Sequence, residues 1–352
     1  MNGGGIMEHV RAFEGRTVLV TGGAGAIGSN LTAALSKADV KKVIVLDDLS
    51  SAERWNIPSR PNVLFAQGSI LDEVALKRVF FERPEYVFHL AAFFANQNSV
   101  DHPERDLMTN GLGTLKILQY SVMSNVKRVV YASSGCAIYG CEAPLPLTEE
   151  FTSMNLSSPY QITKMLGELY SNFFRNHYSL PVVKARFFNS YGPGEVPGQY
   201  RNVIPNFIYW ALKGRPLPIT GTGEETRDFT YVGDLVDGIL RGAYYDEAIG
   251  EEFNLASGRE TRIIDLAHMV NKLTGNSAGI SFTERRRWDT KSRLLASTKK
   301  ANALMGYKPE MEFEQGLMNT IEWFKENWEK IEEAARFAPG MSAAVRGYSS
   351  VK

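Results

Sequence analysis

The sequence predicts an α/β protein with a doubly wound parallel sheet of the Rossmann type and a smaller mixed α/β substrate-binding domain. Three observations indicate this fold. Residues 17–48 have the pattern of a strand, a glycine-rich turn, a helix and a second strand. Apolar runs then alternate with helical patterns as far as residue 187, which is typical of parallel sheets with right-handed crossovers. From about residue 190 this alternation is lost, which indicates a second domain.

The first strand–helix–strand unit has the features of a dinucleotide site. A β-branched run at residues 17–21 predicts a buried strand, and Gly22, Gly25 and Gly28 follow it. Glycines at this spacing allow a tight turn, a close approach to a pyrophosphate and close helix–strand packing, and the helix N-terminus favours phosphate. Asp47 ends the second strand about 20 residues later. A carboxylate there can accept both ribose hydroxyls of NAD and would repel the extra phosphate of NADP.

The remaining elements of the expected sheet follow in order. Strands are expected at residues 62–66, 86–90, 128–131 and 182–187, and helices at about 72–82, around 110–114 and from about residue 158. Because ligands of such sheets lie beyond the carboxyl ends of the strands, the residues at these ends are candidate site residues. They are Gly22, Asp47, Ala91, Ser133 and Asn189.

Composition narrows the class of protein. The 352 residues are 44% hydrophobic and 22% charged, which is enough for a large core in one big domain or two ordinary ones. The formal net charge is zero, so we expect no nucleic-acid partner, and the absence of an apolar run of 18 residues argues against a membrane span. Two cysteines make no disulfide framework, and residues 1–15 lack a secretion signal, which favours a cytoplasmic location.

These patterns divide the chain into four parts. Residues 1–15 are expected to be a flexible leader, and residues 16–189 the NAD-binding Rossmann domain. Residues 190–333 begin with a loop rich in glycine and proline at 191–198. They are expected mainly to bind the nucleotide sugar and to return in part to the sheet near 228–234. Residues 334–352 are rich in Ala, Gly and Ser and are expected to form a loose tail.

Tyr160 and Lys164 are four residues apart, on one face of an expected helix. A tyrosine with its ordinary pKa of about 10 is a poor base at neutral pH, but a nearby ammonium and a positive nicotinamide ring both favour phenolate. Such a tyrosine can take a proton from a sugar hydroxyl while the carbon gives hydride to NAD. The pair alone is common on surface helices, but after a Rossmann unit and a serine-rich strand end it indicates catalysis.

The sequence resembles the extended short-chain dehydrogenase/reductase family, in particular the nucleotide-sugar branch of UDP-glucose 4-epimerase-like proteins, 4,6-dehydratases and UDP-glucuronate decarboxylases. The resemblance covers about residues 16–330, in the family's order. The matching motifs are TGGAGAIG at 21–28, LDD at 46–48, HLAA at 89–92, Asn110 with Gly113 and Thr114, Ser133 and Ser134 with Tyr139 and Gly140, Tyr160 with Lys164, RFFNSYGP at 186–193, GTG at 221–223 with RDF at 227–229, and Asp234.

This resemblance implies NAD as the cofactor and a nucleoside-diphosphate sugar as the substrate, with no metal. The implied NAD-binding residues are Gly22, Gly25, Ala26, Ile27, Asp47, Ser69, Ile70, Leu90, Ala91, Ala92, Asn110, Tyr160 and Lys164. The implied substrate residues are Asn189 at the sugar or diphosphate, Asn202 and Val203 along the nucleotide, Arg227 at phosphate, and Arg286 and Asp289 at the diphosphate and ribose. The run 285–287 also has the pattern of a solvated charge cluster.

Two departures from the family pattern bear on the reaction. In the dehydratases, Asp and Glu stand three and two places before the Tyr-Gly pair and eliminate water, and the decarboxylases also use the Glu. Cys136 and Ala137 hold these places here. Because elimination needs an acid and a base within reach, dehydration and decarboxylation both lose support.

The 4-epimerases need a Ser or Thr that assists the tyrosine, but that position is Gly135. Ser134 or Ser133 is a possible substitute, and Cys136 is either an unusual acid or a small packing residue. Ser69 stands where the family usually has an Asp that reaches the adenine, so adenine binding there is expected to differ.

The sequence therefore predicts an NAD-dependent nucleotide-sugar epimerase that inverts C4 through a 4-keto intermediate, with Tyr160, Lys164 and Ser134 as catalytic residues. Alternatives are another nucleotide-sugar isomerase, such as a mutase or an epimerase at another carbon, then a dehydratase or decarboxylase, and lastly a scaffold that binds nucleotide without turnover. Relatives imply a homodimer. The apolar residues Ile162, Leu166, Leu169 and Phe173 on the Tyr160 helix fit a dimer interface or the core equally.

Overall fold

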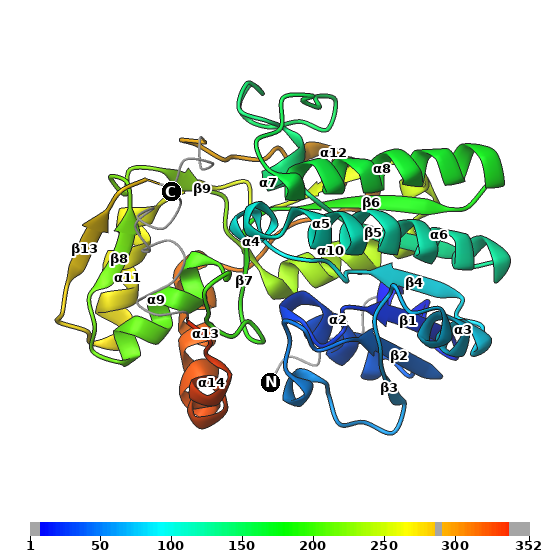
Figure 1. Ribbon diagram of the computed structural model, residues 1–352, viewed down its shortest axis with the longest axis horizontal. Helices are drawn as coiled ribbons and strands as arrows, with labels where there is room; N and C mark the ends of the chain where they lie inside the picture. The colour runs from blue at the N-terminus through cyan, green and yellow to red at the C-terminus, as the bar shows by residue number, and fades with distance from the viewer. Residues whose placement is uncertain (1–7, 286–290, 338–352) are drawn as a thin grey trace.

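The computed structural model describes residues 8–285 and 291–337. Its centre is a seven-stranded parallel sheet in the order β11-β6-β5-β4-β1-β2-β3 (Figure 1). The strands are β1 (Thr17–Thr21), β2 (Lys42–Asp47), β3 (Val63–Gln67), β4 (Tyr86–His89), β5 (Arg128–Ser134), β6 (Val182–Phe187) and β11 (Glu252–Leu255). The order reverses at β1, which pairs with β2 on one side and β4 on the other. The predicted doubly wound fold is therefore confirmed, with its ligand crevice expected beside β1.

Helices cover both faces of this sheet. On one face α2 (Ala26–Ser36) and α10 (Val232–Tyr244) pack together, and α12 (Lys299–Met305) contacts α10. On the other face lie α3 (Glu73–Phe81), α6 (Thr114–Met123) and α8 (Pro159–Tyr178), over a second apolar core. The short elements between them are η1 (Arg54–Asn56), α4 (Asn96–Asp101), α5 (Pro103–Asp106), the π-helix η2 (Leu107–Gly113), α7 (Gly135–Ile138) and η3 (Asp246–Ala248).

A second, smaller unit with its own core lies beside the carboxyl edge of the sheet (Figure 1). Its helices are α9 (Val203–Leu212), α11 (Ile263–Thr274), α13 (Phe313–Glu326) and α14 (Trp328–Ala334). Its strands are β8 (Leu217–Thr220), which pairs in parallel with β13 (Ile280–Thr283), and β9 (Thr226–Arg227), which pairs with β12 (Thr261–Arg262). The short pair β7 (Ser190–Tyr191) and β10 (Thr230–Tyr231) joins the two units.

The structure differs from the sequence expectations at both ends of the described chain. Residues 8–15 do not behave as a flexible leader, because α1 (Glu8–Arg11) contacts α10 and Phe13 is completely buried in the core. His9 Nε2 is also 2.8 Å from the Asp237 carboxylate. At the other end Phe337 stacks on Tyr209 at a centroid distance of 5.5 Å, so the expected loose tail does not begin at residue 334. Apolar burial explains both differences.

The seventh strand of the sheet was not identified in the sequence analysis. After the small unit begins, the chain returns through α10 and adds β11 beside β6.

Within residues 8–285 and 291–337, the helices are too short or too polar for any of them to cross a membrane.

Candidate functional site

A cavity of about 1140 Å³ lies at the carboxyl edge of the sheet, between the two units. It exceeds the usual volume of a single ligand pocket, roughly 300–1,000 Å³, so it can hold a dinucleotide and a second ligand together. Most residues predicted from the sequence line it. They are Gly22, Gly25, Ala26, Ile27, Asp47, Ser69, Ile70, Leu90, Ala91, Ala92, Ser134, Tyr160, Lys164, Asn189, Asn202, Val203 and Arg227.

The glycine-rich loop after β1 forms a cradle in which two positions leave no room for a side chain. Gly22 has φ +69°, and a Cβ there would lie 2.6 Å from the amide nitrogen of Ala91. A Cβ on Gly28 would lie 2.1 Å from the Gly22 carbonyl oxygen. Gly25 is the N-cap of α2, whose first turn lines the cavity. The bare backbone and the helix N-terminus together fit the pyrophosphate of NAD.

Asp47 lies at the end of β2 as predicted, but its carboxylate also supports the cradle. It accepts hydrogen bonds from the Ala24 amide at 3.0 Å and the Leu49 amide at 2.9 Å. Burial raises the pKa of Asp47, and these backbone bonds oppose the rise. Asp48 lines the same part of the cavity. The role of Asp47 toward ribose stays a prediction.

Asn110 is buried and is not among the residues that line the cavity, and its contact with NAD stays a prediction. Its Oδ1 accepts from the Phe93 amide at 2.7 Å, and its Nδ2 donates to Asp106 at 2.8 Å. The side chain therefore fixes the loop after β4 and supports the wall from behind. Ser69 does line the cavity, and its hydroxyl accepts from the Leu71 amide at 3.2 Å, which stabilises the turn after β3.

Helix α8 carries Tyr160 and Lys164 into the cavity. The helix starts at Pro159, and its N-cap Ser158 accepts a hydrogen bond from the Gln161 amide. Lys164 Nζ donates to the Ala132 carbonyl at 2.8 Å and lies 5.6 Å from the centre of the Tyr160 ring. Burial lowers the pKa of Lys164 to about 8, although the carboxylate of Asp106 opposes this.

The protein alone disfavours the phenolate of Tyr160. Burial raises its pKa, the nearby Cys136 and Asp106 raise it further, and a hydrogen bond with Ser134 lowers it. The phenolate therefore needs more positive charge than the buried Lys164 supplies, and a bound nicotinamide ring would supply it. The ring of Tyr160 packs edge-on against Phe94, with centroids 5.9 Å apart.

The two serines at the end of β5 have different partners. Ser134 interacts with the Tyr160 phenol, whereas the hydroxyl of Ser133 donates to Glu168 at 2.6 Å. Of the two substitutes considered for the missing side chain at Gly135, Ser134 lines the cavity together with Tyr160 and lowers its pKa, which favours Ser134, whose catalytic role stays a prediction.

Cys136 is half-buried: it lines the cavity and also packs against the apolar cluster that includes Tyr139 and Phe188. Its thiol donates to Asn189 Oδ1 at 3.3 Å, and burial raises the pKa of the thiol. The ammonium of Lys291 donates to the Cys136 carbonyl at 2.8 Å, so a cation lies at this end of the cavity. The sequence analysis did not identify Lys291, although it follows the predicted late Arg–Asp motif by two residues.

The predicted substrate residues are only partly described. Val203 begins α9, and Arg227 donates to the carbonyls of Thr226 at 2.8 Å and Lys291 at 3.3 Å. Both line the cavity. Arg286 and Asp289 lie outside the described residues.

Asn202 faces a buried carboxyl that the sequence analysis missed. Its Nδ2 donates to Glu195 Oε1 at 2.9 Å, while Glu195 Oε2 is buried with no hydrogen-bond partner among the described residues. Burial raises the pKa of Glu195 to about 7, and Arg201 opposes the rise. Charged residues within a loop of glycines and prolines were the only sequence signal for this group.

Residues 193–202, here called the cover segment, lie against both sides of the cavity. Asn30 donates to the Pro193 carbonyl and Asn56 to the Gly194 carbonyl, each at 2.8 Å. Arg201 bonds to the Ser51 carbonyl after β2. On the opposite side, the Tyr200 hydroxyl donates to Asp101, at the end of α4, at 3.0 Å.

The described residues contain no group of three or more His, Cys, Asp or Glu side chains placed to hold a metal ion. The chemistry that the site supports is proton and hydride transfer on a ligand between the glycine-rich cradle and the smaller unit.

Comparisons with known proteins agree with this geometry. A UDP-glucose 4-epimerase of Mycolicibacterium smegmatis is 34% identical over 310 residues, which are 87% of this chain and 98% of that protein. The structure of an epimerase from Methanothermobacter thermautotrophicus is 56% identical, with a TM-score of 0.93 and coverage of 94% of this chain and 98% of that one. The Bordetella bronchiseptica enzyme WbmF, in complex with NAD+ and UDP, is 38% identical, with a TM-score of 0.81 and coverage of 92% and 96%.

A family model also matches residues 18–256, which are more than half of the chain and include the cradle, Tyr160 and Lys164. The cavity fits NAD, and NAD is the cofactor of this enzyme. The chain belongs to the NAD dependent epimerase/dehydratase family.

Proposed function

We propose that this protein inverts C4 of a UDP-hexose through a 4-keto intermediate, with NAD as a cofactor that is not consumed. The observation that carries the proposal is the meeting of Tyr160, Lys164 and Ser134 in one cavity with the glycine-rich cradle. The relative from M. smegmatis is a UDP-glucose 4-epimerase, and the structure of WbmF contains UDP with NAD+, which supports the choice of nucleotide.

In this reaction Tyr160 takes the proton of the C4 hydroxyl and later returns it. Lys164 favours the phenolate by its charge, and Ser134 donates a hydrogen bond to the phenol or to the substrate hydroxyl. When bound, NAD supplies reversible uptake of a hydride from C4. The 4-keto sugar then turns within the cavity and presents its other face.

Elimination and decarboxylation have less support. Ala137 is buried against Ile138 and Tyr160 and offers no acid at the place where the dehydratases and decarboxylases carry Glu. Cys136 is a weak acid whose pKa is raised further by burial, and its thiol is bonded to Asn189. Neither residue supplies the acid–base pair that elimination needs.

A second candidate substrate is a UDP-hexuronate. Lys291 donates from its ammonium to the Cys136 carbonyl and lines the same cavity as Tyr160, so we place this cation near the reacting end of the cavity. A sugar carboxylate at this end of the cavity would be attracted to this ammonium, whereas a neutral hexose offers it no anion. This observation favours epimerisation of an acidic sugar by the same residues.

We also propose that two copies of the chain pair through α8 and the adjoining η2–α6 segment. Ile162, Leu169 and Phe173 are each at least half exposed on one face of α8, and Leu107 and Met123 are exposed on the neighbouring segment. A second copy would cover this face by a two-fold interface.

The cytoplasmic location expected from the sequence stays a prediction.

The test of the function is product analysis by proton NMR. Purified protein with NAD is incubated with UDP-glucose, UDP-N-acetylglucosamine and UDP-glucuronate, and with the corresponding dTDP- and GDP-sugars. The C4 epimer of one UDP-sugar is expected, and Tyr160→Phe should abolish its formation. A 4-keto-6-deoxy product, a ring isomer, or substrates that all return unchanged would contradict the proposal.

A further inference from the structure

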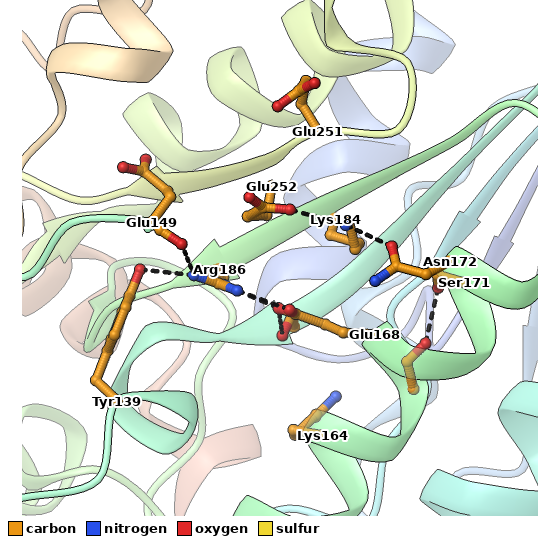
Figure 2. A network of polar contacts seen from close by, with 12 residues as sticks. Tyr139, Glu149, Lys164, Glu168, Ser171, Asn172, Lys184, Arg186, Glu251 and Glu252 are labelled. Carbon is orange, nitrogen blue, oxygen red and sulfur yellow. Dashed lines mark hydrogen bonds and ion pairs between the residues drawn. The ribbon is translucent and has the colours of Figure 1, made fainter. Parts of the chain in front are cut away.

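A buried ion pair lies two turns along α8 from Tyr160 (Figure 2). Arg186, on β6, donates from Nε to Glu168 Oε1 at 2.9 Å and from Nη2 to Glu168 Oε2 at 2.8 Å. Its Nη1 donates to the Tyr139 hydroxyl at 3.0 Å. Arg186 and Glu168 are both less than 5% exposed. A bidentate pair with this burial holds the Glu168 carboxylate in one orientation.

The same carboxylate holds the end of β5. Glu168 Oε1 accepts the hydroxyl of Ser133 at 2.6 Å, and Ser133 is buried. Two more bonds join this part of β5 to the same stretch of α8, because Lys164 Nζ donates to the Ala132 carbonyl and the Tyr131 hydroxyl donates to the Lys164 carbonyl at 3.3 Å. Three successive residues of the strand are thus attached to α8.

Ser134 is the next residue, and its direction depends on Ser133. Successive residues of a strand point in opposite directions, so fixing Ser133 toward Glu168 fixes the rotation of the strand end. Ser134 then lines the same cavity as Tyr160, and its hydroxyl lowers the pKa of the phenol. Position 135, where the resemblance to the family places the assisting side chain, is glycine.

We propose that Glu168 is a positioning residue that acts through Ser133 to hold Ser134 against Tyr160, and so selects the serine that assists the tyrosine. Ser133 is then the link and not a catalytic residue. This inference rests on the proposed epimerase function, because the assisting hydroxyl matters only where Tyr160 exchanges a proton with the substrate.

The first variant is Ser133→Ala, which removes the link and leaves the Glu168–Arg186 pair intact. We expect kcat to fall about tenfold, a part of the roughly 10²–10⁴-fold that a positioned acid–base group contributes, with little change in KM. The acidic limb of the pH–rate profile should move to higher pH, because a displaced Ser134 no longer lowers the pKa of Tyr160. Calorimetry should show unchanged binding of the UDP-sugar.

Ser171→Ala is the matched control. Ser171 is a buried serine on the same helix, but its hydroxyl donates to the Gly167 carbonyl of α8 itself, at 2.8 Å, and not to β5 (Figure 2). It should lose a similar amount of thermal stability and keep the wild-type kcat and pH profile. A fall in kcat that is equal in both variants would overturn the inference, because it would reflect stability alone.

Ser134→Ala, alone and combined with Ser133→Ala, separates positioning from a direct role. If Ser133 acts through Ser134, the double variant should be no slower than Ser134→Ala. An additive loss, or a wild-type rate in Ser134→Ala, would overturn the inference. Glu168→Gln is a second variant, expected to act like Ser133→Ala in soluble, folded protein.

The two proposals fail in different ways. No turnover by the wild-type protein with any nucleotide sugar overturns the epimerase function and this inference with it. Wild-type turnover that Tyr160→Phe abolishes, combined with an unchanged kcat in Ser133→Ala, leaves the function standing and overturns only the role of Glu168 and Ser133.

Discussion

The ring of Phe188 occupies the space in which a side chain at position 135 would lie. A Cβ on Gly135 would be 2.0 Å from Cε2 and 2.3 Å from Cζ of Phe188. The Phe188 ring is buried and stacks on Tyr139 with a centroid distance of 6.3 Å. The glycine at position 135 is therefore part of the packing, which supports the proposal that the neighbouring Ser134 assists Tyr160.

A serine at position 135 should destabilise the protein unless the side chain at position 188 is also made smaller. We expect Gly135→Ser to lower the free energy of unfolding by about 1–3 kcal/mol, the usual cost of overpacking a core. Phe188→Leu removes ring atoms near position 135, so Gly135→Ser should cost less in that background. Urea unfolding of the wild type, both single variants and the double variant measures the coupling. Additive losses would show that the ring does not exclude the side chain.

Lys291→Met tests the choice between a neutral and an acidic sugar. If the ammonium beside Cys136 binds a sugar carboxylate, the variant should raise KM for UDP-glucuronate about tenfold or more and leave KM for UDP-glucose nearly unchanged. Steady-state kinetics with both substrates measures this. Arg262→Met, on the surface of the smaller unit, is the control for loss of a cation. Equal rises for both sugars would instead place Lys291 at the diphosphate.

The fold was largely predictable because its signals are local. The alternation of apolar runs and helices, with glycines after β1 and Asp47 after β2, predicted six of the seven strands. The strand β11 was missed because its partner β6 lies about 70 residues earlier and nothing in its four residues marks the return. The packing of Phe13 was missed for a similar reason, since its neighbours Tyr86 and Phe88 are distant in sequence.

In the site, motif residues were predictable and the groups assembled from distant segments were not. The spacing of Tyr160 and Lys164, together with the motifs before them, predicted this pair, and both residues line the cavity. The Glu168–Ser133 bond and the contact of Lys291 with Cys136 join residues 35 and 155 positions apart, which no local pattern encodes. The motif match that assigned Asn110 to the cofactor did not reveal that its side chain also accepts a hydrogen bond from the Phe93 amide, because a motif match does not give the direction of a side chain.

The buried carboxyl of Glu195 should make stability fall as pH rises. Its folded pKa of about 7 lies above the ordinary 4.5, so between these pH values the folded state binds more protons than the unfolded state. The free energy of unfolding then decreases across this window, by up to about 3 kcal/mol for a shift of this size. Glu195→Gln cannot ionise, and its stability relative to wild type should increase between pH 4.5 and 8.

Urea unfolding at pH 4.5, 6 and 8 measures this difference, with Glu104→Gln as the control. Glu104 is an exposed carboxylate at the same cavity, so this change should give a difference that varies little with pH. A pH-independent difference for Glu195→Gln would mean that Glu195 is ionised in the folded protein, in an ion pair with Arg201.

The exposed apolar face of α8 should control the oligomeric state. Leu169 is 56% exposed at the centre of this face, and a charge there would have to be buried in a dimer. We expect Leu169→Glu to give a monomer in sedimentation velocity at micromolar concentration, and the wild type a dimer. Phe81→Glu, at an exposed apolar residue on α3, should leave the dimer intact. A wild-type monomer, or a Leu169→Glu dimer, would exclude this interface.

The cover segment should slow the exit of the cofactor. It contacts the loop after β2 through Arg201 and the end of α4 through Tyr200, and these two points lie on opposite sides of β1 in the sheet order. A dinucleotide on the cradle after β1 would therefore lie beneath it, and release would require one of these contacts to open.

Removing the Tyr200 hydroxyl should weaken the cover segment without removing a cofactor contact. A hydrogen bond to a charged group contributes about 1.5–3 kcal/mol, so Tyr200→Phe should speed release of NADH roughly tenfold or more and change its association rate little. Stopped-flow displacement of NADH by excess NAD, followed by fluorescence, measures both rates. The control is Tyr120→Phe, which loses a hydroxyl–carboxylate bond of 2.6 Å to Glu73, between α6 and α3. If both variants release NADH at the wild-type rate, the cover segment opens without breaking the contact between Tyr200 and Asp101, and this contact does not retain the cofactor.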